Sequence, residues 1–273
     1  MKERSNISTL TISFEGKTLY ELSIPVKTPS KEGDNKTISK MYFVAGAGND
    51  RQGWNYTQRF ENIWSSIGIS GFTKLNVSLT SDILAKSKVL PPLPDLLYTL
   101  DYRNKVSNRI DGLIADSLPE NPHVQVRKRI QKDKNSKILA KDTQLNLCGY
   151  SFGSVVVSQA AIQICDEGFV IDNLVLIGSP VSINSELFQQ LLKYKADNKI
   201  CQIIRNDIKD DLFSNPKDIF EFKDGIPQNS DSSGPHFDLA RPDDPSTPNI
   251  DESKIADDKI RELGQILISK GVK

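Results

Sequence analysis

Residues 145–161 read LNLCGYSFGSVVVSQAA, and the roles of the other segments follow from this stretch. Its apolar first half predicts a buried strand, and the apolar run after Ser151 predicts a buried helix. Ser151 stands at the corner between them, flanked by Gly149 and Gly153 in the pattern G-x-S-x-G. A serine lifted above the end of a strand needs a strained backbone, and the chain two residues to either side then approaches too closely for side chains. The two glycines therefore fit a sharp strand-to-helix corner.

The segments around this corner predict a sheet wound with helices. Two apolar runs within 7–25 are joined at Glu15-Gly16-Lys17, which predicts an antiparallel hairpin at a sheet edge. We expect an α/β fold with a mostly parallel central sheet, this N-terminal antiparallel hairpin, and helices on both faces. The expected strands are 41–44, 74–79, 174–177 and 200–205, and the expected helices are 56–67, 154–167, 184–195 and 251–270.

Composition limits the classes of protein that fit. The 273 residues fit a single α/β domain over 1–273. The 35 basic and 35 acidic residues cancel, so the overall charge gives no reason to expect a nucleic-acid partner. Cys148, Cys165 and Cys201 lie in apolar segments, which predicts reduced core residues rather than disulfides or a metal site. No apolar run is long enough for a transmembrane segment.

The stretch from about 80 to 142 is irregular and reads as an insertion. Residues 89–100, VLPPLPDLLYTL, are apolar but contain three prolines, which exclude one long helix and make the segment a candidate lid. Basic residues then accumulate over 124–141. Two interpretations stay open for them: a solvated helix that covers the sheet, or a cationic rim that contacts anionic lipid headgroups.

Two further features bear on whether Ser151 is a nucleophile. A serine hydroxyl needs a general base within hydrogen-bonding reach, and the chain has two histidines, His123 and His236. Acyl transfer also needs N–H donors aimed at the developing oxyanion. The loop Ala45-Gly46-Ala47-Gly48 follows a predicted strand, and its small residues let the backbone approach a substrate. A nucleotide site is disfavoured there, because neither G-K-[ST] nor a complete GxGxxG follows.

Several short motifs occur in one order: MYFVAGAGND, LNLCGYSFGS, LVLIGSPV, an aspartate-rich turn at 206–213, and GPHFD. Together they resemble the lipase and esterase branch of the α/β-hydrolase superfamily over roughly 40–270. The resemblance implies the α/β-hydrolase fold and ester hydrolysis through an acyl-enzyme, without a metal or an organic cofactor. One departure is that Ala45-Gly46 stands where the family usually has His-Gly.

The resemblance also implies the triad. The family order is serine, then acid, then histidine, so Ser151 is the expected nucleophile and His236 the expected base. His123 precedes the serine and is expected to be a surface histidine. The acid is expected in the aspartate-rich turn, where Asp210 best fits the usual form of an acid, one residue and an apolar pair. Asp207 and Asp211 stay open as alternatives.

The expected oxyanion donors come from two loops. One is the backbone N–H of Phe152, the residue after the nucleophile. The other is the backbone N–H of Ala47, with Gly46 as its neighbour. Metal ions have no place in this expected site.

The leading hypothesis for function is a serine carboxylic ester hydrolase, and more narrowly a lipase or phospholipase. The ordered triad residues and the candidate lid support it. A thioesterase or small-ester esterase would use the same mechanism and stays open, as does a hydrolase-like binding protein without turnover. The expected partners are an ester or lipid substrate and the surface of a membrane, contacted peripherally, and no nucleic acid. Acyl length and headgroup are left open.

The N-terminal residues bear on location. MKERSNISTL lacks the apolar core of a cleaved secretory signal. The chain is therefore expected to be cytoplasmic as synthesised, and any export would use a route without a cleaved signal peptide. Bacterial lipase effectors that are delivered in this way fit the pattern, and so does a cytosolic esterase.

Overall fold

The computed structural model describes residues 7–14, 17–25, 36, 38–46, 54–75, 122–229, 234–241 and 251–273. The chain divides into two compact units, 1–36 and 37–273. The first contains β1 (Ile7–Phe14) and β2 (Lys17–Pro25), which pair antiparallel in a two-stranded sheet. The predicted pairing of these two runs is observed. Their predicted place at an edge of the main sheet is not confirmed, because the described strands of that sheet do not include them.

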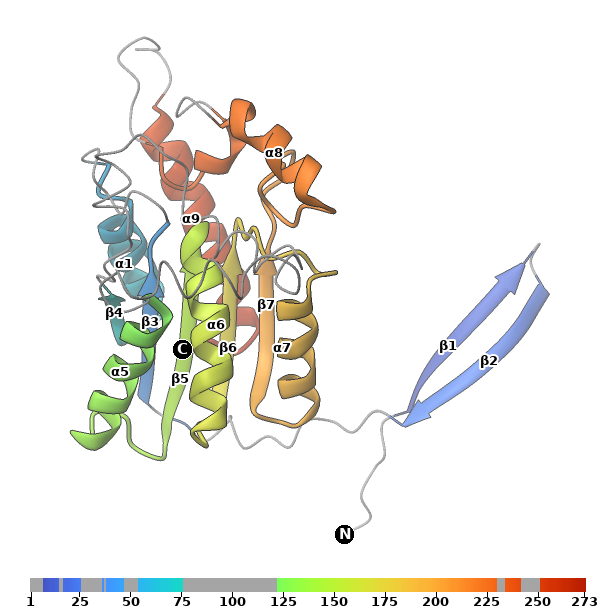
Figure 1. Ribbon diagram of the computed structural model, residues 1–273, viewed down its shortest axis with the longest axis horizontal. Helices are drawn as coiled ribbons and strands as arrows, with labels where there is room; N and C mark the ends of the chain where they lie inside the picture. Colours follow the sequence, from blue (N-terminus) through green and yellow to red (C-terminus); the bar gives the residue numbers. More distant parts are fainter. Residues whose placement is uncertain are drawn as a thin grey trace, which may run out of the picture. The chain divides into compact units, whose positions relative to one another are not determined.

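The second unit is built on a parallel sheet (Figure 1). The described residues contribute five strands, in the order β4-β3-β5-β6-β7, and every neighbouring pair is parallel. The predicted α/β class and mostly parallel sheet are therefore confirmed. The strands are β3 (Ile38–Val44), β4 (Phe72–Leu75), β5 (Thr143–Tyr150), β6 (Ile171–Ile177) and β7 (Ile200–Asn206).

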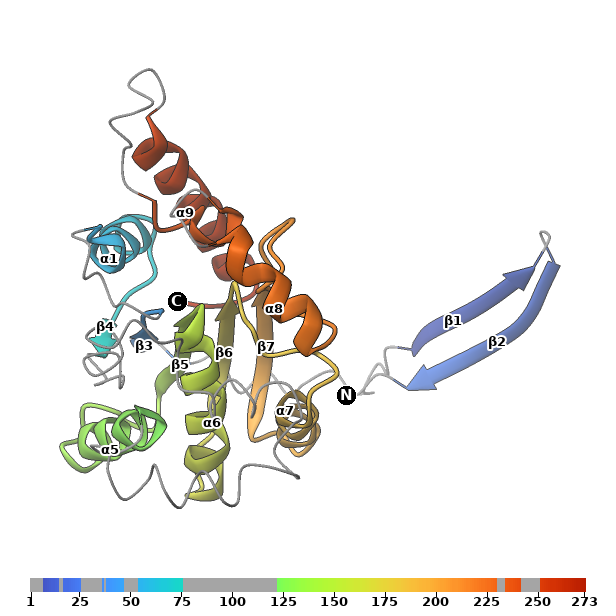
Figure 2. The same cartoon turned by 45° about the horizontal axis from the view of Figure 1, so that its top comes forward.

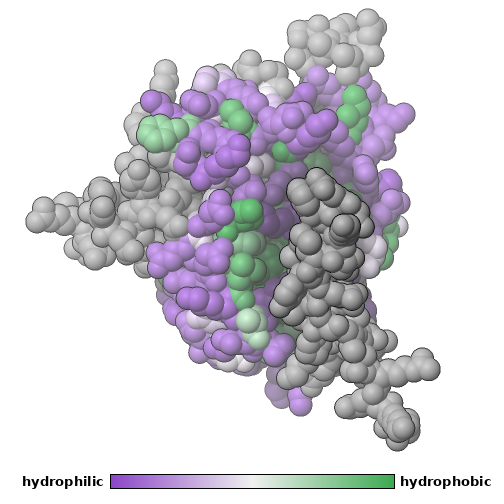
Figure 3. Space-filling view, turned by 90° about the vertical axis from the view of Figure 1, so that its right-hand side faces the viewer, coloured by the Kyte–Doolittle hydropathy of each residue, from purple (hydrophilic) through white to green (hydrophobic). Residues whose placement is uncertain are grey.

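Helices cover both faces of this sheet, as predicted (Figure 2). One face carries α1 (Tyr56–Ser66) and α9 (Glu252–Ser269). The other carries α5 (Pro122–Asn135), α6 (Phe152–Asp166) and α7 (Glu186–Ala196). Within the described residues, none of the helices has the length and apolar content needed to cross a membrane. The face drawn in Figure 3 is mostly hydrophilic, with hydrophobic residues gathered near its middle.

The alternation of side chains along β3 divides the core into two layers. Met41 and Phe43 are buried with the apolar residues of α1 and α9, whereas Tyr42 and Val44 are buried with those of α5 and α6. The apolar stripe predicted for the C-terminal helix is confirmed, because its four members are buried in α9: Ala256, Ile260, Leu263 and Leu267. Both layers meet at β5, which is buried along its whole length and ends at the serine corner.

Two segments differ from the sequence-based expectation or extend it. The stretch 206–250 reads as an acidic loop, yet it contains α8 (Ile219–Gln228). Asp218 begins this helix, because its carboxylate accepts hydrogen bonds from the N–H groups of Phe220 and Glu221. The basic stretch 124–141 contributes α5, which ends at Asn135. The candidate lid at 89–100 and the end of the strand predicted at 74–79 lie outside the described residues.

The cysteines give a test of these layers. Cys148 and Cys165 are buried free thiols, but Cys201 is exposed on the edge strand β7, so its predicted place in the core is wrong. Burial raises the pKa of the Cys148 thiol well above its usual value and that of Cys165 to about 12.

We therefore expect Ellman's reagent at pH 8 to modify Cys201 alone in the folded protein and every cysteine in denaturant. Cys201→Ser should abolish the native reaction, and modification of Cys148 in the folded protein would contradict the burial of its thiol.

Candidate active site

Ser151 occupies a strained corner between β5 and α6. Its φ is 53° and its ψ is −127°, a region that residues with a side chain rarely adopt. The corner is held from two sides. The Ser151 N–H donates to the carbonyl of Ile177 in β6 at 2.8 Å, and the Ser154 hydroxyl donates to the Ser151 carbonyl. The neighbouring strand and the first turn of α6 thus stabilise the strain that the sequence pattern predicts.

The two glycines of the corner allow close backbone packing. A Cβ on Gly149 would overlap the backbone of Gly153. A Cβ on Gly153 would overlap the carbonyl oxygen of Val44 at the end of β3. The first turn of α6 therefore lies directly against β3, and larger residues at either position would push the serine corner out of place.

His236 reaches this corner from a distant part of the chain. It lies in the short 3-10 helix η2 (Pro235–Phe237) and is 4% exposed. Its Nε2 is 2.6 Å from Ser151 Oγ. Because its Nδ1 faces a carboxylate, we assign the single N–H of the neutral imidazole to Nδ1. This leaves Nε2 to accept from the serine hydroxyl. The predicted nucleophile and base are thus in contact. His123, by contrast, lies in the first turn of α5.

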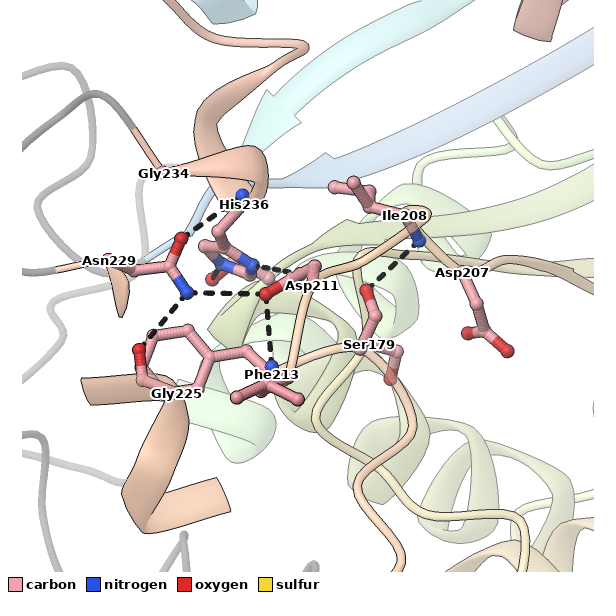
Figure 4. Close-up of polar contacts among 12 residues, drawn as sticks. Ser179, Asp207, Ile208, Asp211, Phe213, Gly225, Asn229, Gly234 and His236 are labelled. Carbon is pink, nitrogen blue, oxygen red and sulfur yellow. Dashed lines mark hydrogen bonds and ion pairs between the residues drawn. The ribbon is translucent and has the colours of Figure 1, made fainter. Parts of the chain in front are cut away.

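The carboxylate beside His236 belongs to Asp211 (Figure 4). Its Oδ2 is 2.6 Å from His236 Nδ1, and its side chain is fully buried. Its other oxygen, Oδ1, accepts from the N–H of Phe213 at 3.0 Å and from the amide of Asn229 at 3.3 Å. Both oxygens of the buried carboxylate are therefore hydrogen-bonded, as a buried charge requires.

The geometry thus places the alternative, Asp211, beside His236, in place of the predicted Asp210. Asp210 is exposed and adopts a left-handed conformation with φ 63°. Its carbonyl oxygen accepts from the Gln228 side chain at 2.8 Å. Asp207 is also exposed, pairs with Arg205 at 2.7 Å, and points away from His236 in Figure 4. The left-handed turn at Asp210 is what directs the next side chain, that of Asp211, inward.

The predicted oxyanion donors are only partly described. Phe152 is the first residue of α6, so its N–H has no acceptor within the helix, as an oxyanion donor requires. Ala47 lies outside the described residues. Its neighbour Gly46 lies against the serine, because a Cβ on Gly46 would be 2.9 Å from Ser151 Cβ. The Gly46 N–H donates to the Tyr56 hydroxyl at 2.9 Å, which ties Gly46 to the first turn of α1.

The histidine is also held by residues that sequence patterns did not single out for this role. The Tyr150 hydroxyl donates to the carbonyl of His236, and the two rings are stacked at 5.9 Å and 14°. Burial raises the pKa of Tyr150 well above its usual value, so it stays a protonated donor. Phe213 places its ring edge-on to the imidazole at 5.1 Å. Arg241 donates to the carbonyl of Gly234, two residues before His236, at 3.0 Å.

The site therefore brings together a serine, an imidazole and a buried carboxylate in one hydrogen-bonded line. Within the described residues, no group of three or more His, Cys, Asp or Glu side chains could hold a metal ion. No protein-family model, curated protein or solved structure matches the chain. Any function has to be argued from the geometry of these residues.

Proposed function

We propose that the protein is a serine hydrolase that cleaves carboxylic esters through an acyl-enzyme on Ser151. The observation that supports the proposal is the pair of 2.6 Å contacts that link Ser151, His236 and Asp211. A serine in such a line can lose its proton to the imidazole as it attacks a carbonyl carbon. The strained corner supports the same conclusion, because strain of this kind persists where the surroundings hold a reactive group in place.

The chemistry follows from these positions. As Ser151 Oγ bonds to the ester carbonyl carbon, His236 Nε2 takes the hydroxyl proton, and Asp211 stabilises the imidazolium. The negative charge on the carbonyl oxygen is stabilised by the Phe152 N–H and by a second donor, for which Ala47 stays our proposal. His236 then protonates the leaving alcohol. A water molecule, deprotonated by His236, releases the carboxylic acid and restores Ser151.

The arrangement in the chain supports a place in the lipase and esterase branch of the α/β-hydrolase superfamily. The corner follows the central strand β5, and the serine, the acid and the histidine occur in that order. The carboxylate of Asp211 is supplied just beyond β7, and Gly46, which follows β3, lies against the serine. These are the positions that the superfamily mechanism needs.

A lipid substrate is the narrower part of the proposal. Figures 1 and 2 place α8 beyond the carboxyl ends of β6 and β7, at the same end of the sheet as Ser151. On this helix Phe220 is 70% exposed, and Ile183, after β6, is 43% exposed. Exposed apolar side chains at this end of the sheet favour contact with lipid over contact with a small polar ester. The basic residues of α5 remain candidates for contact with anionic headgroups.

The test is to treat the folded wild-type protein with a fluorophosphonate probe and to assay it on esters. We expect the probe to label one site, located by peptide mass spectrometry at Ser151. We also expect turnover of p-nitrophenyl esters and phospholipids, with a rise in rate when a substrate passes from monomers to micelles. Equal rates on monomers and micelles would favour the small-ester esterase or thioesterase. A folded protein that neither labels nor turns over any substrate would instead be a binding protein, which would refute the proposal.

A further inference from the structure

Asn229 caps the C-terminal end of α8 and lies beside Asp211 and His236, in contact with both (Figure 4). It is 8% exposed. It is 18 positions along the chain from Asp211 and 7 from His236, so no local sequence pattern marks it. Its position is produced by α8, a helix in a stretch whose acidic sequence is typical of a loop.

The Asn229 amide contacts both His236 and Asp211, the two residues that follow Ser151 in the hydrogen-bonded line. Its Nδ2 donates to Asp211 Oδ1 at 3.3 Å and to the carbonyl of Gly225 at 3.1 Å. Its Oδ1 accepts from the backbone N–H of His236 at 3.1 Å. The same planar group thus contacts the carboxylate oxygen that does not face the imidazole, and also the main chain that carries the imidazole.

The chemistry of this position requires an amide. A donor is needed toward Asp211 and an acceptor toward His236, and an asparagine side chain provides both. A leucine of similar size would provide neither and would leave the His236 N–H without this acceptor. Gly234 completes the fit, because a Cβ at that residue would overlap the Asn229 Oδ1 atom.

We propose that Asn229 is a positioning residue that sets the geometry between Asp211 and His236. With Oδ1 of Asp211 engaged by Asn229 and Phe213, Oδ2 is directed to the imidazole. With its N–H held by Asn229, His236 keeps Nε2 within reach of Ser151. The inference rests on the proposed function, because positioning affects a rate only if these residues carry out the reaction.

The kinetic test compares Asn229→Leu and Asn229→Ala with Asn173→Ala. Asn173 is a buried amide of β6 that donates to Asn146, so its loss tests the general cost of removing a buried amide. We expect kcat to fall about 10²-fold in both Asn229 variants, the size of effect that small misplacements produce. KM should change little, because Asn229 lies behind the acid and the base. The control should lose thermal stability but keep its kcat.

A spectroscopic readout separates positioning from general damage. The His236 Nδ1–H in its 2.6 Å contact with Asp211 should give a far-downfield proton signal, which ¹⁵N-histidine labelling and His123→Gln would assign. In Asn229→Leu, whose size preserves packing, this signal should broaden or move upfield. The proposal is overturned if a folded Asn229→Leu keeps kcat within about threefold and keeps the signal, or if Asn173→Ala loses as much kcat.

This experiment also distinguishes the inference from the proposed function. If the wild type neither labels nor turns over esters, the proposed function fails. The Nδ1–H signal still reports whether Asn229 holds the contact between Asp211 and His236. A signal lost in Asn229→Leu supports the positional role, and a signal retained there refutes it.

Discussion

Ser151→Ala should lower kcat for ester hydrolysis by about a millionfold, down to the level that binding and the oxyanion donors alone sustain. The reason is that Ser151 Oγ is the atom 2.6 Å from His236 Nε2, and no other hydroxyl is placed there among the described residues. The variant should fold, because an alanine is smaller than serine and the corner is held by main-chain contacts. Steady-state assays and fluorophosphonate labelling measure the effect.

The matched control for this variant is Ser158→Ala. Ser158 is buried in the same helix, and its hydroxyl donates to the carbonyl of Ser154, one turn earlier. This hydroxyl is engaged by the Ser154 carbonyl and not by the imidazole of His236, so kcat should stay within about twofold of the wild type. Full probe labelling of Ser151→Ala, or an equal loss of activity in Ser158→Ala, would show that another residue is the nucleophile.

Asp211→Asn should lower kcat by about 10⁴-fold while the protein remains folded. The two side chains have nearly the same shape, but an asparagine amide presents a neutral group to His236 Nδ1. The imidazole then loses both the charge that stabilises its protonated form and the acceptor that holds its tautomer. The measurement is the initial rate against substrate concentration, which gives kcat, with a melting curve to confirm the fold.

Asp210→Asn provides the sharpest comparison, since it makes the same chemical change one residue away. Asp210 is exposed and has φ 63°, a conformation that asparagine tolerates well. This variant should therefore keep both its stability and its kcat. If Asp210→Asn lost activity and Asp211→Asn did not, the acid that the structure places beside His236 would be the wrong one.

The difference between these two aspartates shows why sequence reasoning stops where it does. They are neighbours in one turn, and spacing rules treat them almost alike. Which one faces inward depends on the backbone of Asp210, whose carbonyl is held by Gln228 from the end of α8. That helix is itself preceded by a loop-like, acidic sequence. Its N-terminal cap at Asp218 was a usable local signal, but nothing local places its other end beside His236.

Local patterns in the sequence predict the elements with the strongest apolar signal and the corner at Ser151. The apolar run of β3, the apolar stripe of α9 and the glycines around Ser151 each reflect contacts within one element or across one corner. The contact of Asp211 with His236, and the contacts of Asn229 with both, could be found only in the folded protein. Such contacts join segments that are far apart in the chain. Their geometry depends on how β7, α8 and η2 pack together, and no single stretch of residues encodes it.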